Sequence, residues 1–194
     1  MNKILSNLPE TITTKRLILQ MPRAGFGKLL NEAITDGYED YVEWLNWPSV
    51  MPTEEETEIE CRKHHAEFIT REFIRYLIIE KKSQKVVGRC AFPSFQANWL
   101  IPQFSISYFV SRKYRARGYA TEATRVMVIL AFEELQAKKV EIFCDDQNIA
   151  SCYVAQKLGF SLEYSAKGGR PRKDGTLAEL QCYSLFSRSR LKCL

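Results

Sequence analysis

The stretch Phe104-Ser-Ile-Ser-Tyr-Phe-Val-Ser-Arg-Lys-Tyr-Arg-Ala-Arg-Gly-Tyr-Ala120 decides the fold of this chain. Every second residue from Phe104 to Val110 is apolar or aromatic, which is the alternation typical of a β-strand. The second half breaks this alternation with basic residues and leads into an apolar helix that begins near Thr121. The stretch therefore predicts a strand, a basic turn and the N-terminus of a helix.

The start of this predicted helix is suited to an anion. The first N–H groups of a helix have no intrahelical partner, and the helix dipole places partial positive charge there. Gly118 permits a backbone conformation that other residues resist, and Ala120 leaves room for a bulky group such as a pyrophosphate. Four side chains add mobile positive charge: Arg112, Lys113, Arg115 and Arg117. An ordinary strand-to-helix turn with solvated basic residues is the alternative.

Length and composition set the class of protein. The chain has 194 residues, 45% of them hydrophobic, so we expect one domain over residues 1–194 with a real core. The net charge of +5 suits an anionic ligand, but no basic stripe with interleaved aromatic residues predicts nucleic acid binding. No apolar run approaches a membrane span, and the six scattered cysteines read as reduced thiols. We therefore expect a cytoplasmic protein without membrane or nucleic acid partners.

Strands and helices alternate along the chain, with hairpins at both ends, which predicts a mixed α/β sheet. Strands are predicted over residues 16–19, 76–80, 85–92, 104–110, 140–144, 160–164 and 177–186. Helices are predicted over residues 28–35, 53–71, from 121 onward and over 148–159, and a basic loop over 167–175. The aromatic segment 38–47 is interpreted as a connection.

Three motifs resemble those of one enzyme family. Arg115-x-x-Gly118-x-Ala120 resembles the Q/R-x-x-G-x-G/A signature of the GNAT N-acetyltransferases, whose loop amides bind the pyrophosphate of acetyl-CoA. Downstream, Asp145-Asp-Gln-Asn148-Ile-Ala-Ser151 and Lys157-Leu-Gly-Phe160 resemble the D-x-x-N-x-x-S and K-x-G-F elements of that family. Segments 14–19 and 47–56 resemble the opening of its branch that acetylates the N-terminal amine of ribosomal proteins. The resemblance covers residues 14–186.

The resemblance implies a single-domain GNAT fold of the α/β (α+β) class: a mixed, mostly antiparallel sheet, flanked by helices, with a parallel pair of strands that splay apart. The splayed strands would be residues 104–110 and 140–144, with the cofactor's pantetheine arm between them. The residues implied to contact acetyl-CoA are Tyr108, Phe109, Val110, Arg115, Ala116, Arg117, Gly118, Tyr119, Ala120, Asn148 and Ser151. No metal is expected, because the adjacent His64 and His65 point in different directions on a helix.

Acetyl transfer needs a neutral amine, a donor for the oxyanion and a proton for the departing thiolate. The family places its oxyanion donor at the N–H that corresponds to Val110. A tyrosine often protonates the thiolate, but Ala155 occupies that position here. In the ribosomal-protein branch the matching serine, here Ser151, fills this role; alternatively, Ser151 caps its helix.

The general base is left open by the sequence. Many relatives carry glutamate where this chain has Ser105, so Glu43, Glu80, Asp145 and a relayed water remain candidates. A terminal α-amine, with a reference pKa near 8, needs only a weak base, which favours it over lysine as acceptor.

The acceptor groove is predicted near the aromatic segment. Trp44 and Trp47 either cover an edge of the core or line this groove, with Glu80 as a further contact, and Trp99 to Ile101 can add to it.

Three functions therefore remain: acetylation of a protein N-terminus, acetylation of a small amine (polyamine, antibiotic or amino acid), and an idle CoA-binding module. The protein is expected to be a monomer or a homodimer.

Overall fold

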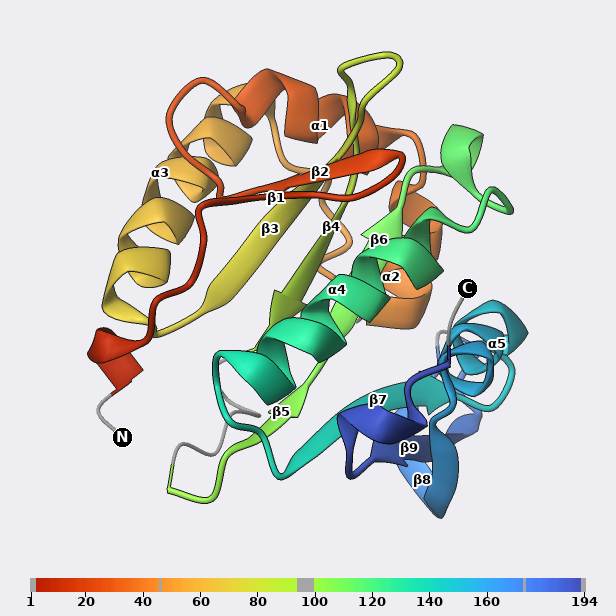
Figure 1. Cartoon of the computed structure of the whole chain (residues 1–194). Helices are drawn as coiled ribbons and strands as arrows, with labels where there is room; N and C mark the ends of the chain where they lie inside the picture. Colours follow the sequence, from red (N-terminus) through yellow and green to blue (C-terminus); the bar gives the residue numbers. More distant parts are fainter. Residues whose placement is uncertain (1–2, 46, 94–99, 173, 193–194) are drawn as a thin grey trace.

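The computed structural model describes residues 3–45, 47–93, 100–172 and 174–192 (Figure 1). Its strands form two sheets. The first is antiparallel, in the order β1 (Thr11–Thr13), β2 (Leu17–Gln20), β3 (Ile74–Glu80), β4 (Val86–Phe92), β6 (Ser107–Val110). The second has the order β5 (Gln103–Ser105), β7 (Lys139–Asp145), β9 (Leu177–Leu185), β8 (Ser161–Pro171).

The stretch that decides the fold passes from one sheet to the other. β5 pairs in parallel with β7, whereas β6 pairs antiparallel with β4. The last link to β7 is the N–H of Ile106, which donates to the carbonyl of Glu141 at 2.8 Å. Beyond it β6 and β7 diverge (Figure 1). The predicted splayed pair is confirmed, although the strand predicted over 104–110 consists of two segments.

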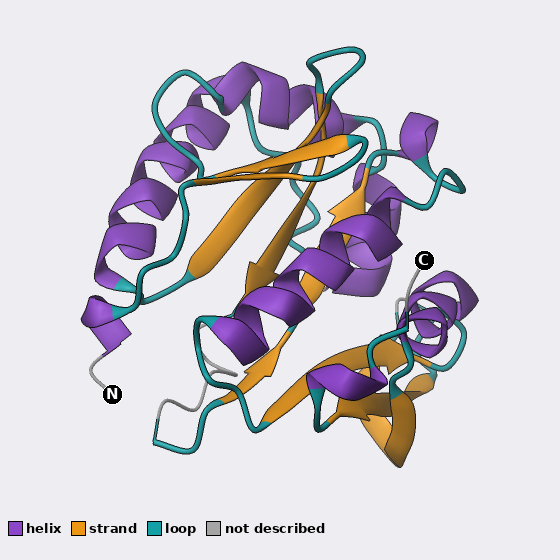
Figure 2. Ribbon diagram, in the orientation of Figure 1, coloured by secondary structure: helices purple, strands orange, loops and turns teal. Residues whose placement is uncertain are grey.

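Helices cover both faces of the antiparallel sheet (Figure 2). On one face lies α4 (Tyr119–Glu133), whose buried Met127 and Val128 join the core formed with β2, β3 and β4. A second cluster on the other face joins α1 (Gly27–Thr35), α2 (Tyr38–Leu45) and α3 (Glu54–Thr70) to the sheet. The fifth helix, α5 (Ile149–Leu158), follows β7 and packs beside α4. No described helix combines the length and the apolar character that a bilayer span requires.

Three details differ from the sequence-based prediction. The short β1 was not predicted, and residues 38–45 form α2 rather than a connection. The aromatic residues of α2 lower its helix propensity, but Tyr41 packs at 4.5 Å from the Phe109 ring, so tertiary contacts stabilise it. The predicted basic loop is a strand as far as Pro171, because β9 supplies its partners and much of it is exposed, which hides the usual alternation.

Candidate active site

The N-terminus of α4 has no side-chain cap. Its N-cap residue is Gly118, whose φ of 78° lies in the left-handed region, and no side chain among the described residues caps it. The first amide to bond within the helix is that of Glu122, which donates to the carbonyl of Gly118 at 3.0 Å. The amides of residues 119–121 precede it and have no intrahelical partner. A negatively charged group therefore fits here.

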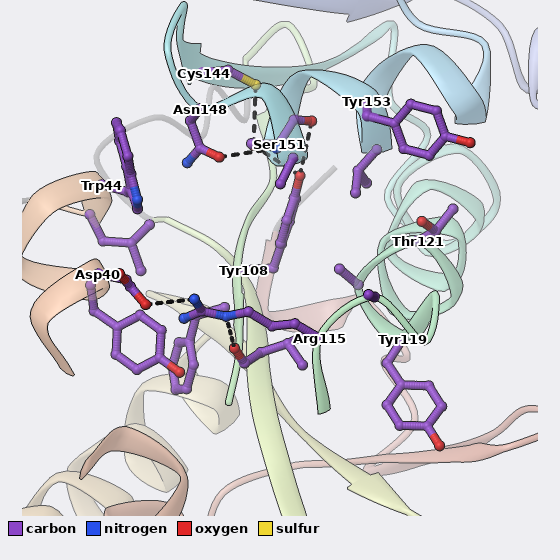
Figure 3. Close-up of a pocket in the computed structure, with 18 of the residues that line it drawn as sticks. Asp40, Trp44, Tyr108, Arg115, Tyr119, Thr121, Cys144, Asn148, Ser151 and Tyr153 are labelled. Carbon is purple, nitrogen blue, oxygen red and sulfur yellow. Dashed lines mark hydrogen bonds and ion pairs between the residues drawn. The ribbon is translucent and has the colours of Figure 1, made fainter. Parts of the chain in front are cut away.

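Most basic side chains of the preceding turn are paired within the protein. Arg115 Nη1 lies 2.5 Å from Asp40 Oδ2 (Figure 3). Arg112 contacts the same carboxylate at 3.2 Å, and Lys113 Nζ lies 3.4 Å from Asp36. The prediction of mobile positive charge needs correction for these three residues. The segment from Asp36 to Asp40 supplies their carboxylates, and its closeness to the turn is a tertiary contact.

A cavity of about 530 Å³ opens at the N-terminus of α4, which we call the mouth of α4 (Figure 3). Its walls come from α2, β6, the turn before α4, α4, β7 and α5. Arg117 does not line it; its guanidinium lies 3.9 Å from Glu80. The other predicted acetyl-CoA contacts do: Tyr108, Phe109, Val110, Arg115, Ala116, Gly118, Tyr119, Ala120, Asn148 and Ser151.

The N–H of Val110 points into the gap between the diverging strands. Ser111 donates its N–H to the carbonyl of Val87 at 2.8 Å, and amides alternate along an antiparallel ladder, so Val110 faces the opposite edge. The carbonyl of Val110 confirms this direction, because it accepts a hydrogen bond from Arg115 Nε at 3.1 Å on the cavity side. A strand residue presents its N–H and C=O to the same edge.

Ser151 also faces the cavity. The N-cap of α5 is Asn148, whose side-chain oxygen accepts the N–H of Ser151 at 3.1 Å, so the hydroxyl of Ser151 is not the cap. This hydroxyl lies 3.0 Å from the hydroxyl of Tyr108 and accepts from the thiol of Cys144 at 3.2 Å. Figure 3 shows the Tyr108 and Ser151 side chains pointing toward each other.

Burial keeps the neighbours of Ser151 protonated. It raises the pKa of the Tyr108 phenol well above its usual range, although the hydrogen bond with Ser151 opposes this. It also raises the pKa of the Cys144 thiol to about 12. At neutral pH the three groups therefore form a chain of uncharged donors.

A second cavity, of about 440 Å³, is lined by residues of α2, β4, β6 and β7. Trp44, Tyr108, Phe109 and Ser151 line both cavities, as do Leu45, Phe143 and Asp145. The two cavities therefore meet where β6 and β7 diverge. A ligand that enters from the mouth of α4 and one that enters from the second cavity would meet beside Tyr108 and Ser151, next to Val110 in the first cavity.

Comparison with known proteins identifies the family. A model of the acetyltransferase (GNAT) domain matches residues 16–161. The chain belongs to the GNAT family. An uncharacterized N-acetyltransferase of Bacillus licheniformis, p20, is 27% identical over 115 residues, which cover 59% of this chain and 62% of p20. Against the first three curated relatives, the matched segments span between 34% and 62% of their lengths.

Solved structures confirm the predicted GNAT fold. The microcin C7 self-immunity acetyltransferase MccE, solved with acetyl-CoA and AMP, superposes with a TM-score of 0.81 at 18% identity, over 94% of this chain and 99% of that one. RimL, a ribosomal L7/L12 α-N-protein acetyltransferase solved with coenzyme A, superposes with a TM-score of 0.81 at 19% identity, over 91% of this chain and 98% of that one.

The predicted acceptor contacts of this GNAT chain fall in different places. Trp44 lines both cavities and Trp47 lines the second. Glu80 lines neither, because its carboxylate is turned to the hydroxyl of Tyr119. Trp99 lies outside the described residues.

Two carboxylates line the cavities of this GNAT domain, and both are held by arginine. Asp40 is bound to Arg115, and Asp145 lies 2.8 Å from Arg170 and 2.9 Å from Arg172. Although burial opposes it, the hydrogen bond from Arg172 and the charges of both arginines lower the pKa of Asp145. Glu43, another candidate base, lines neither cavity.

Sequence reasoning missed several residues of the site. Ala150, Tyr153, Val154 and Lys157 line the first cavity from one face of α5. Their spacing of three and four residues is the helical repeat, so the signal was present once Ser151 was placed on a helix. Arg89 lines the second cavity, and no motif marks it.

Proposed function

We propose that this protein transfers the acetyl group of acetyl-CoA to a primary amine, and that its preferred acceptor is the N-terminal α-amine of a protein or peptide. One observation carries the proposal: the uncapped mouth of α4 opens into a cavity that continues between β6 and β7 to Val110 and Ser151. RimL and MccE, which share this fold, were solved with CoA ligands.

The pyrophosphate of acetyl-CoA would lie against the free amides of residues 119–121, where the helix dipole favours anions. The exposed Lys157, on the cavity-facing side of α5, is placed to attract the remaining phosphate. The pantetheine arm would then follow the unpaired edges of β6 and β7. This direction brings the thioester to the junction of the two cavities.

The reaction then uses groups at that junction. The amine nitrogen attacks the thioester carbonyl, a C–N bond forms, and the N–H of Val110 donates to the developing oxyanion. The C–S bond breaks, and the departing sulfur takes a proton from Ser151. A proton from water then returns to Ser151 through Tyr108, whose hydroxyl lies 3.0 Å from that of Ser151. The amine releases its own proton to water.

A weak base is sufficient for an α-amine. Both carboxylates at the cavities are neutralised by arginines, so neither is a strong base toward a protonated amine. The reference pKa of an α-amine is near 8, against about 10.4 for lysine, so a larger fraction of the α-amine is already neutral at pH 7. The RimL likeness supports the same acceptor.

A thiol-release assay with acetyl-CoA tests this proposal. The acceptors are a peptide with a free N-terminus, the same peptide with a blocked N-terminus and an internal lysine, and spermidine. We expect turnover with the free N-terminus alone. Turnover with spermidine alone indicates a small-amine enzyme. CoA binding by calorimetry without any turnover indicates an idle binding module.

A further inference from the structure

The second cavity contains a positive charge that the protein only partly neutralises. Three of its lining residues are charged: Arg89, Asp145 and Arg170. Asp145 is bound by Arg170 and also by Arg172, which does not line the cavity. Asp146 lies 2.5 Å from Arg172, so the two arginines and the two aspartates neutralise one another. Among the described residues of the lining, Arg89 is the remaining charge.

Arg89 has a distant counter-charge. Its ion-pair partner is Glu60, but Nη1 and Oε2 are 3.7 Å apart, which is longer than a hydrogen bond, and Nη1 has no hydrogen-bond partner among the described residues. The Arg89 side chain is 16% exposed, whereas that of Glu60 is 49% exposed, so water screens the carboxylate more than the guanidinium. A second nearby carboxylate, Glu67, is bound to Arg75.

The surroundings of Arg89 are aromatic. Its guanidinium carbon lies 5.5 Å from the Trp47 ring and 5.6 Å from the Phe109 ring. These rings attract a cation weakly, but they cannot replace a hydrogen-bonding anion. A guanidinium in such an apolar wall gains most from a carboxylate that fits its planar fork with two parallel hydrogen bonds.

Arg89 is also close to the reacting centre. It lies directly opposite Phe109 in the β4–β6 ladder, one residue from Val110. A strand residue spans about 3.3 Å, so a group bound at Arg89 is separated from the reacting nitrogen by roughly one to three residues.

We propose that Arg89 binds a carboxylate of the acceptor, so that the preferred substrate is a primary amine with an acidic group one to three residues from the reacting nitrogen. This inference rests on the proposed function and specifies its substrate class. Polyamines and other polycationic amines are disfavoured, because Arg89 repels a second positive charge. The carboxylate comes either from an acidic side chain near a peptide N-terminus or from a free amino acid.

Matched acceptor pairs distinguish these sources. We would measure kcat/KM for peptides that differ only by Glu or Gln at position 2 or 3, for free alanine against alaninamide, which lacks the free carboxylate, and for spermidine. We expect the acidic member of at least one pair to be preferred by tenfold or more. A preference in the peptide pairs identifies a chain terminus, and one in the amino-acid pair identifies a free amino acid.

Variants of Arg89 test whether this side chain is responsible. In Arg89→Gln the acidic preference should fall toward one, with an unchanged acetyl-CoA Kd, because Arg89 does not line the first cavity. Arg89→Lys keeps the positive charge but loses the planar guanidinium, so it should give an intermediate acidic preference. This variant replaces Arg89→Gln in the test if Arg89→Gln does not fold. The control Arg62→Gln changes an exposed arginine of α3 that pairs with Glu58 and should behave as wild type.

Equal rates within every pair, a preference for spermidine, or an acidic preference that survives in Arg89→Gln would overturn the inference. Absence of both acetyl-CoA binding and turnover with any amine would instead count against the proposed function. The two failures are therefore distinguishable.

Discussion

The N-termini of α3 and α4 meet the same physical requirement in opposite ways. At α3 the hydroxyl of Thr53 accepts the N–H of Glu56 at 3.2 Å, and the carboxylate of Glu56 accepts the N–H of Thr53 at 2.8 Å. At α4 the N-cap is Gly118, which has no side chain to offer. Unpaired amides need a partner, so α3 supplies its own and α4 leaves them for a ligand.

The charged side chains at the two helix ends show the same contrast between a helix end that is complete by itself and one that is open to a ligand. The first turn of α3 holds three glutamates at the positive end of the dipole. The first turn of α4 contains Glu122, but its carboxylate accepts hydrogen bonds from Thr14 at 2.6 Å and from Arg16 Nε at 2.7 Å. Although burial opposes them, these bonds lower the pKa of Glu122. The negative charge of Glu122 is therefore already paired within the protein. The N-terminus of α3 stabilises the fold, whereas that of α4 is available for binding.

The largest expected effect is at the mouth of α4. Gly118→Glu places a negative charge at the phosphate position in a backbone with φ of 78°, so acetyl-CoA should bind on the order of 100-fold more weakly by calorimetry. Gly175→Glu is the matched control: it also has positive φ, at 82°, and open space, but lies in the β8–β9 turn. Unchanged affinity in Gly118→Glu would remove the basis for this binding site.

The buried face of α3 predicts a pH effect on stability. Burial, with the charges of Arg75 and Arg89, lowers the pKa of His64 to about 2. Unfolded His64 takes up a proton near pH 6.5 and the folded residue does not, so stability falls as pH drops below 6.5, by about 1.4 kcal/mol per pH unit.

The variant His64→Leu should therefore lose less stability than wild type between pH 6.5 and 4.5, by a difference of about 2.3 kcal/mol, because unfolded His64 is already half protonated at pH 6.5. Urea denaturation at several pH values measures this. Parallel pH profiles for the two proteins would show that His64 is not the titrating group.

The N-terminus of α5 has an internal cap, as α3 does, and it also faces the first cavity, as α4 does. Asn148 caps the helix, so Ser151→Ala should leave the fold unchanged. It should lower kcat by about tenfold or more, because the departing sulfur loses its proton donor, with a much smaller effect on the acetyl-CoA Kd. Steady-state kinetics and calorimetry separate the two quantities. A wild-type kcat would leave Ser151 with a packing role only.

The smallest effect is expected at the cap of α3. Thr53→Ala removes an internal cap and should lower the free energy of unfolding by about 1 kcal/mol in urea titrations. Acetyl-CoA affinity should not change, since Thr53 lines neither cavity. A loss of affinity would contradict the division between the two helix ends.

Local patterns determined much of this structure. The alternation before Val110, the glycine at 118 and the capping box at Thr53 each depend on residues within a few positions of one another, so the sequence alone indicates them. The motifs between residues 108 and 160 likewise indicate the GNAT family from the sequence alone, without any tertiary contact. Ten residues around the first cavity follow from these motifs.

Only the tertiary structure decided how distant segments meet. The ion pair of Arg115 with Asp40 joins residues 75 positions apart, and the contact of Tyr108 with Ser151 spans 43 positions. The position of Arg89 in the second cavity likewise depends on how β4, α3 and β6 pack. Such contacts depend on the relative placement of whole helices and strands, and short-range periodicity contains no information on that placement.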